Sequence, residues 1–181
     1  MNKNLLLFSF LLLSGFFGTY AQLQTKTGPM SKNFGPVYPV PEANFRTDKS
    51  AKFHAVFDVS RKPADSSRVN PSLETAARYL NLHLQNGFEK QNLKVAMVIH
   101  GKAVKDLLLS ESYQQEFGID NPNLPLVRTL IEAGVELVLC GQSSAYHGVQ
   151  LSETIPGTQM ALSAMTALVQ LQNEGYRLIH F

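Results

Sequence analysis

Cysteine is nearly absent from this chain of 181 residues, because Cys140 is the only one. A single cysteine excludes a disulfide within the chain. In an oxidising compartment, an unpaired cysteine is buried, joined to a partner or used chemically. Any thiol chemistry of this protein therefore depends on one residue.

Charged residues are also sparse, at 17% of the sequence, and the formal net charge is only +2. No run of lysine and arginine forms the basic patch that binding to a phosphate backbone requires. We therefore expect no nucleic-acid partner.

Sequence motifs for metals and nucleotides are missing as well. The five histidines are scattered, and no pair has the spacing of a zinc or haem motif. Gly101-Lys102 follows an apolar run but lacks the spaced glycines of a phosphate-binding loop. The sequence predicts neither a metal nor a bound cofactor.

The apolar run near the amino terminus, residues 5–17, is shorter than the roughly 20 residues of a transmembrane helix. It follows Lys3 and precedes Thr19-Tyr20-Ala21, a pattern typical of a secretory signal peptide over residues 1–21. No cysteine of the lipobox type, which would carry a lipid, follows this run. We expect cleavage after Ala21, a periplasmic or secreted protein and no stable membrane anchor; an uncleaved signal anchor is the alternative.

Residues 22–50 are rich in proline and glycine, including Gly28-Pro29 and Gly35-Pro36. Proline interrupts helices and removes hydrogen-bond donors from strands, so this segment is predicted to be an extended leader, attached to the domain only in part. The remaining residues, 51–181, are enough for one domain with its own core.

Apolar runs and helical patterns alternate along that domain. Strands are predicted at residues 52–59, 94–100, 135–140 and 176–181, and helices at 70–87, 104–109, 111–121, 121–134, 142–146 and 158–175. This order predicts an α/β fold, a three-layer α/β/α sandwich around a mainly parallel sheet of four to five strands. A fifth strand is expected within residues 151–155; the alternative is four strands, with the helical segments between residues 104 and 134 forming one longer crossover. Met165 is expected in the core with Ala164 and Leu168.

Cys140 ends the apolar run Val135-Glu136-Leu137-Val138-Leu139 and is followed by Gly141-Gln142-Ser143. The carboxyl ends of parallel strands are where ligands and reactive groups collect. A helix beginning directly after the strand would direct backbone N–H groups at the sulfur and favour the thiolate. Cys140 is either such a reactive thiol or a small buried hydrophobic residue. His100 ends another strand and is a candidate neighbouring base.

Two other kinds of chemistry fit these residues less well. Gly141-Gln142-Ser143-Ser144-Ala145 approaches the nucleophile elbow of hydrolases, but Ala145 replaces the second glycine. Cys140-Gly141-Gln142-Ser143 is a C-x-x-S sequence, but in thioredoxin-like folds that motif follows an early strand, not a late one.

From residue 52 to the end, the chain resembles the DsrE/DsrF-like sulfur-relay family, and in particular its exported, stand-alone branch. The resemblance rests on Val98-Ile99-His100-Gly101, on Glu132-Ala133-Gly134-Val135-Glu136, on Cys140 with Gly148-Val149 eight positions later, and on the closing strand 176–181.

The resemblance implies homotrimers or homohexamers and a cysteine, Cys140, that carries sulfane sulfur as a persulfide. Export argues against the tRNA thiolation served by cytosolic relay subunits. The prediction is a sulfur carrier, or sulfurtransferase-like protein, whose partner is a sulfur donor or acceptor protein or a small thiol. Gly141, Gln142 and Ser143 supply donors, with His100 and Gly101 nearby. The alternative is a non-catalytic oligomeric binding module with a buried structural cysteine.

Overall fold

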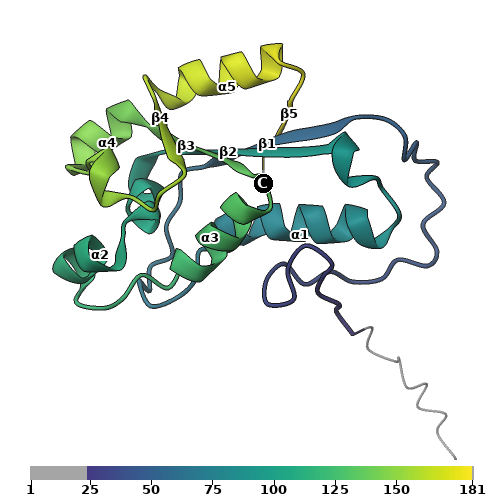
Figure 1. Ribbon diagram of the computed structural model, residues 1–181, viewed down its shortest axis with the longest axis horizontal. Helices are drawn as coiled ribbons and strands as arrows, with labels where there is room; N and C mark the ends of the chain where they lie inside the picture. Colours follow the sequence, from purple (N-terminus) through teal and green to yellow (C-terminus); the bar gives the residue numbers. More distant parts are fainter. Residues whose placement is uncertain (1–23, 181) are drawn as a thin grey trace, which may run out of the picture.

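The computed structural model describes residues 24–180, so the predicted signal peptide lies outside the described residues (Figure 1). A five-stranded parallel sheet forms the centre, in the order β4-β3-β2-β1-β5. Its strands are β1 (Phe53–Val59), β2 (Leu93–Ile99), β3 (Glu136–Cys140), β4 (Thr158–Ala161) and β5 (Arg177–Ile179). The predicted α/β class and parallel sheet are confirmed.

Helices cover both faces of the sheet, which makes three layers (Figure 1). The helices are α1 (Pro71–Gln85), α2 (Ser110–Phe117), α3 (Leu124–Glu132), α4 (Gly141–His147) and α5 (Ala164–Asn173). Figure 1 shows α1 and α3 on one side of the sheet and α5 on the other. The carboxyl ends of the central strands therefore lie between these two layers.

Side chains alternate between the two faces along each strand. In β1, Phe57 and Val59 pack into the larger core with α1 and α3, whereas Val56 packs into a smaller cluster with α5. Val98 of β2 and Cys140 of β3 belong to the same smaller cluster. The thiol therefore lies on the α5 side of the sheet.

The fifth strand is β4, at Thr158–Ala161, and not within residues 151–155 as predicted. Leu151–Glu153 instead forms a 3₁₀ helix, which Gln150 and Glu153 close with reciprocal side-chain-to-backbone hydrogen bonds. As an edge strand, β4 has two exposed residues and no continuous apolar run, so its pattern resembled the start of a helix.

The placement of Met165 in the core was wrong, because its side chain is 76% exposed. Helix α5 begins only after β4, at the N-cap Ser163, and its inward face is formed by Ala164, Ala167 and Leu171. Met165 follows the first inward residue and points outward.

The short helix expected at residues 104–109 is a 3₁₀ helix, Gly101–Leu107, which follows β2 after one residue, His100. It encloses Asp106, whose side chain is fully buried and accepts a 2.7 Å hydrogen bond from Asn70 Nδ2. Burial raises the pKa of Asp106, although Asn70 and Lys62 oppose that effect. Lys62 Nζ lies 3.4 Å from the carboxylate and also donates to Tyr113. These contacts hold the loops after β1 and β2 together.

The leader is attached to the domain along α1, where Glu74 and Gln85 contact it and Asn81, in the middle of the helix, makes the most hydrogen bonds to it. Asn81 is completely buried, and its Oδ1 accepts hydrogen bonds from the backbone N–H groups of Met30 and Ser31. Its Nδ2 donates to the carbonyls of Ser31, Phe34 and Gly35. Residues 38–50 are almost all exposed. The leader is thus docked in its first half and free of the core in its second (Figure 1).

Gly35 makes this docking possible because its backbone lies directly on α1. A Cβ at this position would come within 2.3 Å of the Arg78 backbone nitrogen, and φ is +66°. Only glycine accommodates both the contact and the conformation.

None of the helices within residues 24–180 is long and apolar enough to cross a membrane.

Substituting Asn81 by alanine is expected to lower the free energy of unfolding by about 2–3 kcal/mol, because buried backbone groups of the leader lose their partners. Urea unfolding of the chain without its signal peptide measures this. Asn173→Ala, at an exposed position of α5, is the control and should change stability by less than about 0.5 kcal/mol. Equal stability of both variants would show that the contacts between Asn81 and the leader do not stabilise the fold.

Candidate functional site

The carboxyl ends of β1, β2 and β3 bring most of the predicted site residues together. Ile99 of β2 pairs with Leu139 of β3, so the next residues, His100 and Cys140, lie on neighbouring chains at the same level. On its other side, Cys140 pairs with Ala161 of β4. The cysteine is therefore enclosed between two strand ends.

The Cys140 thiol is both buried and hydrogen-bonded. The residue is 4% exposed and is the N-cap of α4, where Sγ accepts a hydrogen bond from Ser143 N at 3.4 Å. Burial raises the pKa of the thiol, but hydrogen bonds from the Ser143 side chain and from the backbone N–H groups of Ser143, Ala164 and Gln142 outweigh it. The net result is a lowered pKa. Hydrogen bonds to the sulfur therefore favour the thiolate.

Ser143 links the loop after β2 to the sulfur. Its Oγ accepts a 2.9 Å hydrogen bond from the N–H of Gly101, while its hydroxyl hydrogen bonds the Cys140 sulfur. Hydrogen bonds in such a chain polarise one another. Gly101 therefore supports the thiolate indirectly.

Gly141 is required by the close approach of two backbones. A Cβ on this residue would come within 2.7 Å of the Ala161 carbonyl oxygen and 3.3 Å of that of Leu162. Gln142 is only partly engaged, because its exposed side chain donates a long, 3.4 Å hydrogen bond to the Leu162 carbonyl. Gly141 thus lets α4 begin tightly against the end of β4.

His100 lies beside Cys140 in the register, but its ring is hydrogen-bonded elsewhere. Its Nε2 is 2.7 Å from Oδ1 of Asp58, and both side chains are partly exposed. Sequence reasoning did not single out Asp58. The available signal was its position, two residues after the inward Val56 and near the end of β1.

No group of three or more histidine, cysteine, aspartate or glutamate side chains within residues 24–180 is placed to hold a metal ion.

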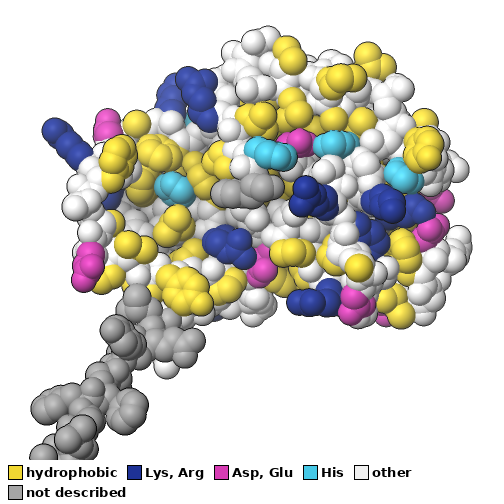
Figure 2. Space-filling view, turned by 180° about the vertical axis from the view of Figure 1, so that it is seen from behind, with side chains coloured by type: hydrophobic (Ala, Val, Ile, Leu, Met, Phe, Trp, Pro, Cys, Tyr) yellow, Lys and Arg dark blue, Asp and Glu magenta, His cyan; other side chains and the backbone are white. Residues whose placement is uncertain are grey.

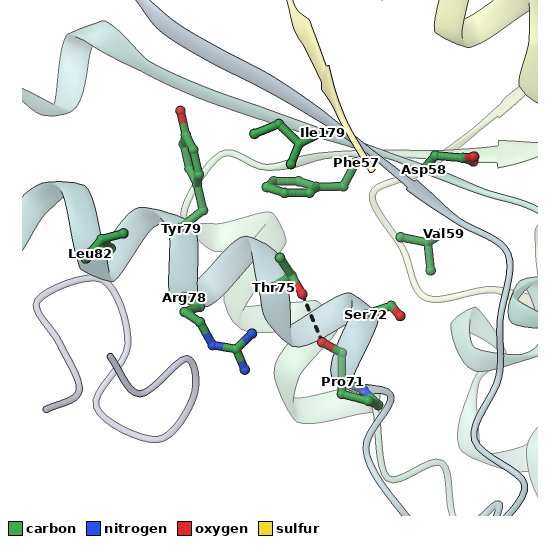
Figure 3. Close-up of a pocket in the computed structure, with 10 residues that line it drawn as sticks. All are labelled: Phe57, Asp58, Val59, Pro71, Ser72, Thr75, Arg78, Tyr79, Leu82 and Ile179. Atoms are coloured by element: carbon green, nitrogen blue, oxygen red, sulfur yellow. Dashed lines mark hydrogen bonds between the residues drawn. The ribbon is translucent and has the colours of Figure 1, made fainter. Parts of the chain in front are cut away.

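A separate hollow of about 500 Å³ lies between α1 and the sheet edge formed by β1 and β5 (Figure 3). Its walls are mainly apolar, with Arg78 and Ser72 among the polar residues that line it. Figure 3 shows Phe57 and Val59 directed toward α1, whereas the Asp58 carboxylate points away from it. The hollow and the cysteine therefore lie on opposite faces of the sheet.

The fold and the site define a class of α/β/α proteins in which a cysteine ends a central parallel strand. Comparison with family models is more specific, because the DsrE/DsrF-like family model matches residues 54–181. The chain belongs to the DsrE/DsrF-like family. The leader precedes the matched region.

Two solved structures share the fold. A protein of unknown function from Methanobacterium thermoautotrophicum, MTH1491, is 19% identical, with a TM-score of 0.54 over 72% of this chain and all of that one. The ychN protein from E. coli is 20% identical, with a TM-score of 0.53 over 71% of this chain and 99% of that one. No curated protein matches the chain.

The lowered thiol pKa leads to a prediction about pH. At any pH below the ordinary thiol pKa, the folded chain holds more thiolate than free cysteine does, so its alkylation by iodoacetamide should reach half its maximal rate at a lower pH. Ser143→Ala removes one hydrogen bond to the sulfur and should move this midpoint upward. Ser152→Ala, at an exposed position remote in sequence, should leave it unchanged. Identical midpoints for the parent chain and Ser143→Ala would contradict the assignment.

Proposed function

We propose that this protein is an exported sulfur carrier of the DsrE/DsrF-like family that holds sulfane sulfur as a persulfide on Cys140. The observation that supports this most directly is the hydrogen bonding of a buried thiol, which lowers its pKa. A carrier thiol must be ionised to attack a sulfur donor. Membership of a family associated with sulfur relay points to the same chemistry.

In the proposed reaction, the Cys140 thiolate attacks the outer sulfur of a donor persulfide and releases the donor thiol. The N–H groups of Gln142 and Ser143 would stabilise the negative sulfur, and Gly141 allows them to approach it. The chain has no second cysteine that would discharge the persulfide as a disulfide. The stored sulfur would then pass to an acceptor protein or a small thiol.

The low exposure of Cys140 favours a second candidate function, a non-catalytic binding or assembly module in which the cysteine only fills space. A thiol that is 4% exposed is accessible to a donor only through a narrow opening or after local movement. The two functions differ in one measurable property, the access of reagents to the native thiol.

We also propose that the protein works outside the cytoplasm as a homotrimer or homohexamer. The sequence pattern of residues 1–21 supports export. Support for assembly comes from an exposed apolar strip on and before α5, formed by Leu162, Met165 and Val169, whose exposed fractions are 74%, 76% and 59%. Figure 2 shows hydrophobic side chains over the region where α5 lies. Contiguous apolar surface of this kind is typical of protein interfaces.

Incubation of the signal-free chain with glutathione persulfide should add the mass of one sulfur atom to Cys140, as measured by mass spectrometry of the intact protein. Cys140→Ser should gain nothing, because it lacks the only thiol. Transfer of that sulfur to cyanide as thiocyanate provides a second readout.

A bulky thiol reagent separates the carrier from the assembly module. Rapid reaction of the native parent chain supports the carrier. If the thiol reacts only after denaturation and the chain also gains no sulfur, the carrier proposal is wrong and the module is favoured.

Met165→Glu introduces a charge at the centre of the exposed strip and should shift the assembly to monomers in analytical ultracentrifugation. Glu174→Gln, at an exposed position at the end of the same helix, is the control and should leave the mass unchanged. Assembly of Met165→Glu identical to that of the parent chain would exclude this strip as the interface.

A further inference from the structure

The pairing of Asp58 with His100 gives the site a feature that sulfur binding at Cys140 alone does not require. The three residues come from the carboxyl ends of β1, β2 and β3, which are neighbours in the sheet. The N–H of His100 donates to the Val59 carbonyl at 2.9 Å and extends the pairing of β1 with β2 by one residue. The alternation of side chains between the two faces of the sheet therefore continues as far as His100.

All three side chains lie on the same face of the sheet. Val56, Val98 and Cys140 pack in the cluster beneath α5. Asp58 lies two residues after Val56, and His100 lies two residues after Val98, so both share that face of the sheet. Neighbouring strands are about 4.8 Å apart, so the chain at His100 passes within about 5 Å of the chain at Cys140.

The hydrogen bond between the pair defines how the histidine is held. An ionised carboxylate only accepts hydrogen bonds, so Nε2 carries a hydrogen that it donates to Asp58 at 2.7 Å. Nδ1 is then the ring nitrogen left to exchange a proton. Since the His100 side chain is 30% exposed, that exchange is open to a molecule arriving from solvent.

We propose that His100, oriented by Asp58, is the general acid that protonates the thiolate leaving the donor when sulfur is transferred to Cys140. This inference rests on the proposed carrier function. As the donor R–S–SH delivers its outer sulfur, a bond forms between that sulfur and Sγ of Cys140, and the S–S bond of the donor breaks. The departing R–S⁻ takes a proton from the imidazolium of His100 and leaves as R–SH. The sulfane sulfur passes between two thiols, so no external oxidant or reductant is needed.

Asp58 is a positioning residue in this step. Its carboxylate accepts the hydrogen bond from Nε2 and so holds the ring in one orientation while Nδ1 donates the proton. The same residue pair also closes the ends of β1 and β2, so a purely structural role is the competing explanation.

The test compares two donors with different leaving groups. Glutathione persulfide releases an alkyl thiolate that needs a proton, whereas 4-nitrophenyl persulfide releases a stable aryl thiolate that does not. His100→Gln and Asp58→Asn should slow sulfur transfer from glutathione persulfide by about 10-fold or more and leave transfer from the aryl donor nearly unchanged. Alkylation by iodoacetamide, which needs no acid, should be the same in the parent chain and both variants. His54→Gln, on the same face of β1 but four residues earlier, is the control and should behave as the parent chain does with both donors.

Each other outcome is informative. Equal losses with both donors would assign the pair a structural role and overturn the proposal, as would unchanged transfer from glutathione persulfide. If the parent chain acquires sulfur from neither donor, the carrier function itself is wrong and this inference is overturned with it.

Discussion

The register of the three central parallel strands determines which residues meet at the site. The pairing of Val59 with Ile99 and of Ile99 with Leu139 brings the ends of β1, β2 and β3 to the same level. A shift of one residue in either ladder would move Asp58 or Cys140 to the opposite face. The buried network around Asp106 ties together the loops that leave β1 and β2, and so maintains this alignment.

Burial and activation act against each other at Cys140. Removing the thiol from water disfavours its ionised form, and the hydrogen bonds from α4 and from the start of α5 restore it. These donors are backbone groups of fixed geometry, together with one hydroxyl that Gly101 holds in place. The packing that limits access to the sulfur therefore also favours its ionised form. The same contacts would serve a sulfur-carrying cysteine and a purely structural one. The two roles differ in whether the packing around Cys140 opens to admit a sulfur donor.

The sequence was sufficient for most of the fold because the central strands are buried on both faces. Continuous apolar runs identified β2 and β3, and Asn70-Pro71 identified the start of α1. It was insufficient for β4, since an edge strand with exposed Gln159 and Met160 lacks such a run. The position of Cys140 followed from local pattern, but the partner of His100 did not. Asp58 is 42 residues away, and strand order is a non-local property that no periodicity records.

The docking of the leader on α1 also determines how the molecule would bear a load. A pull from the amino-terminal side reaches the contacts at Asn81 before it reaches residues 38–50, because those contacts come earlier in the chain. The exposed residues 38–50 would therefore straighten only after those contacts had failed. Until then the tension passes into α1, through the hydrogen bonds of Glu74, Asn81 and Gln85, and bypasses β1. The contacts on α1 therefore shield the strand ends around Cys140 from forces transmitted along the leader.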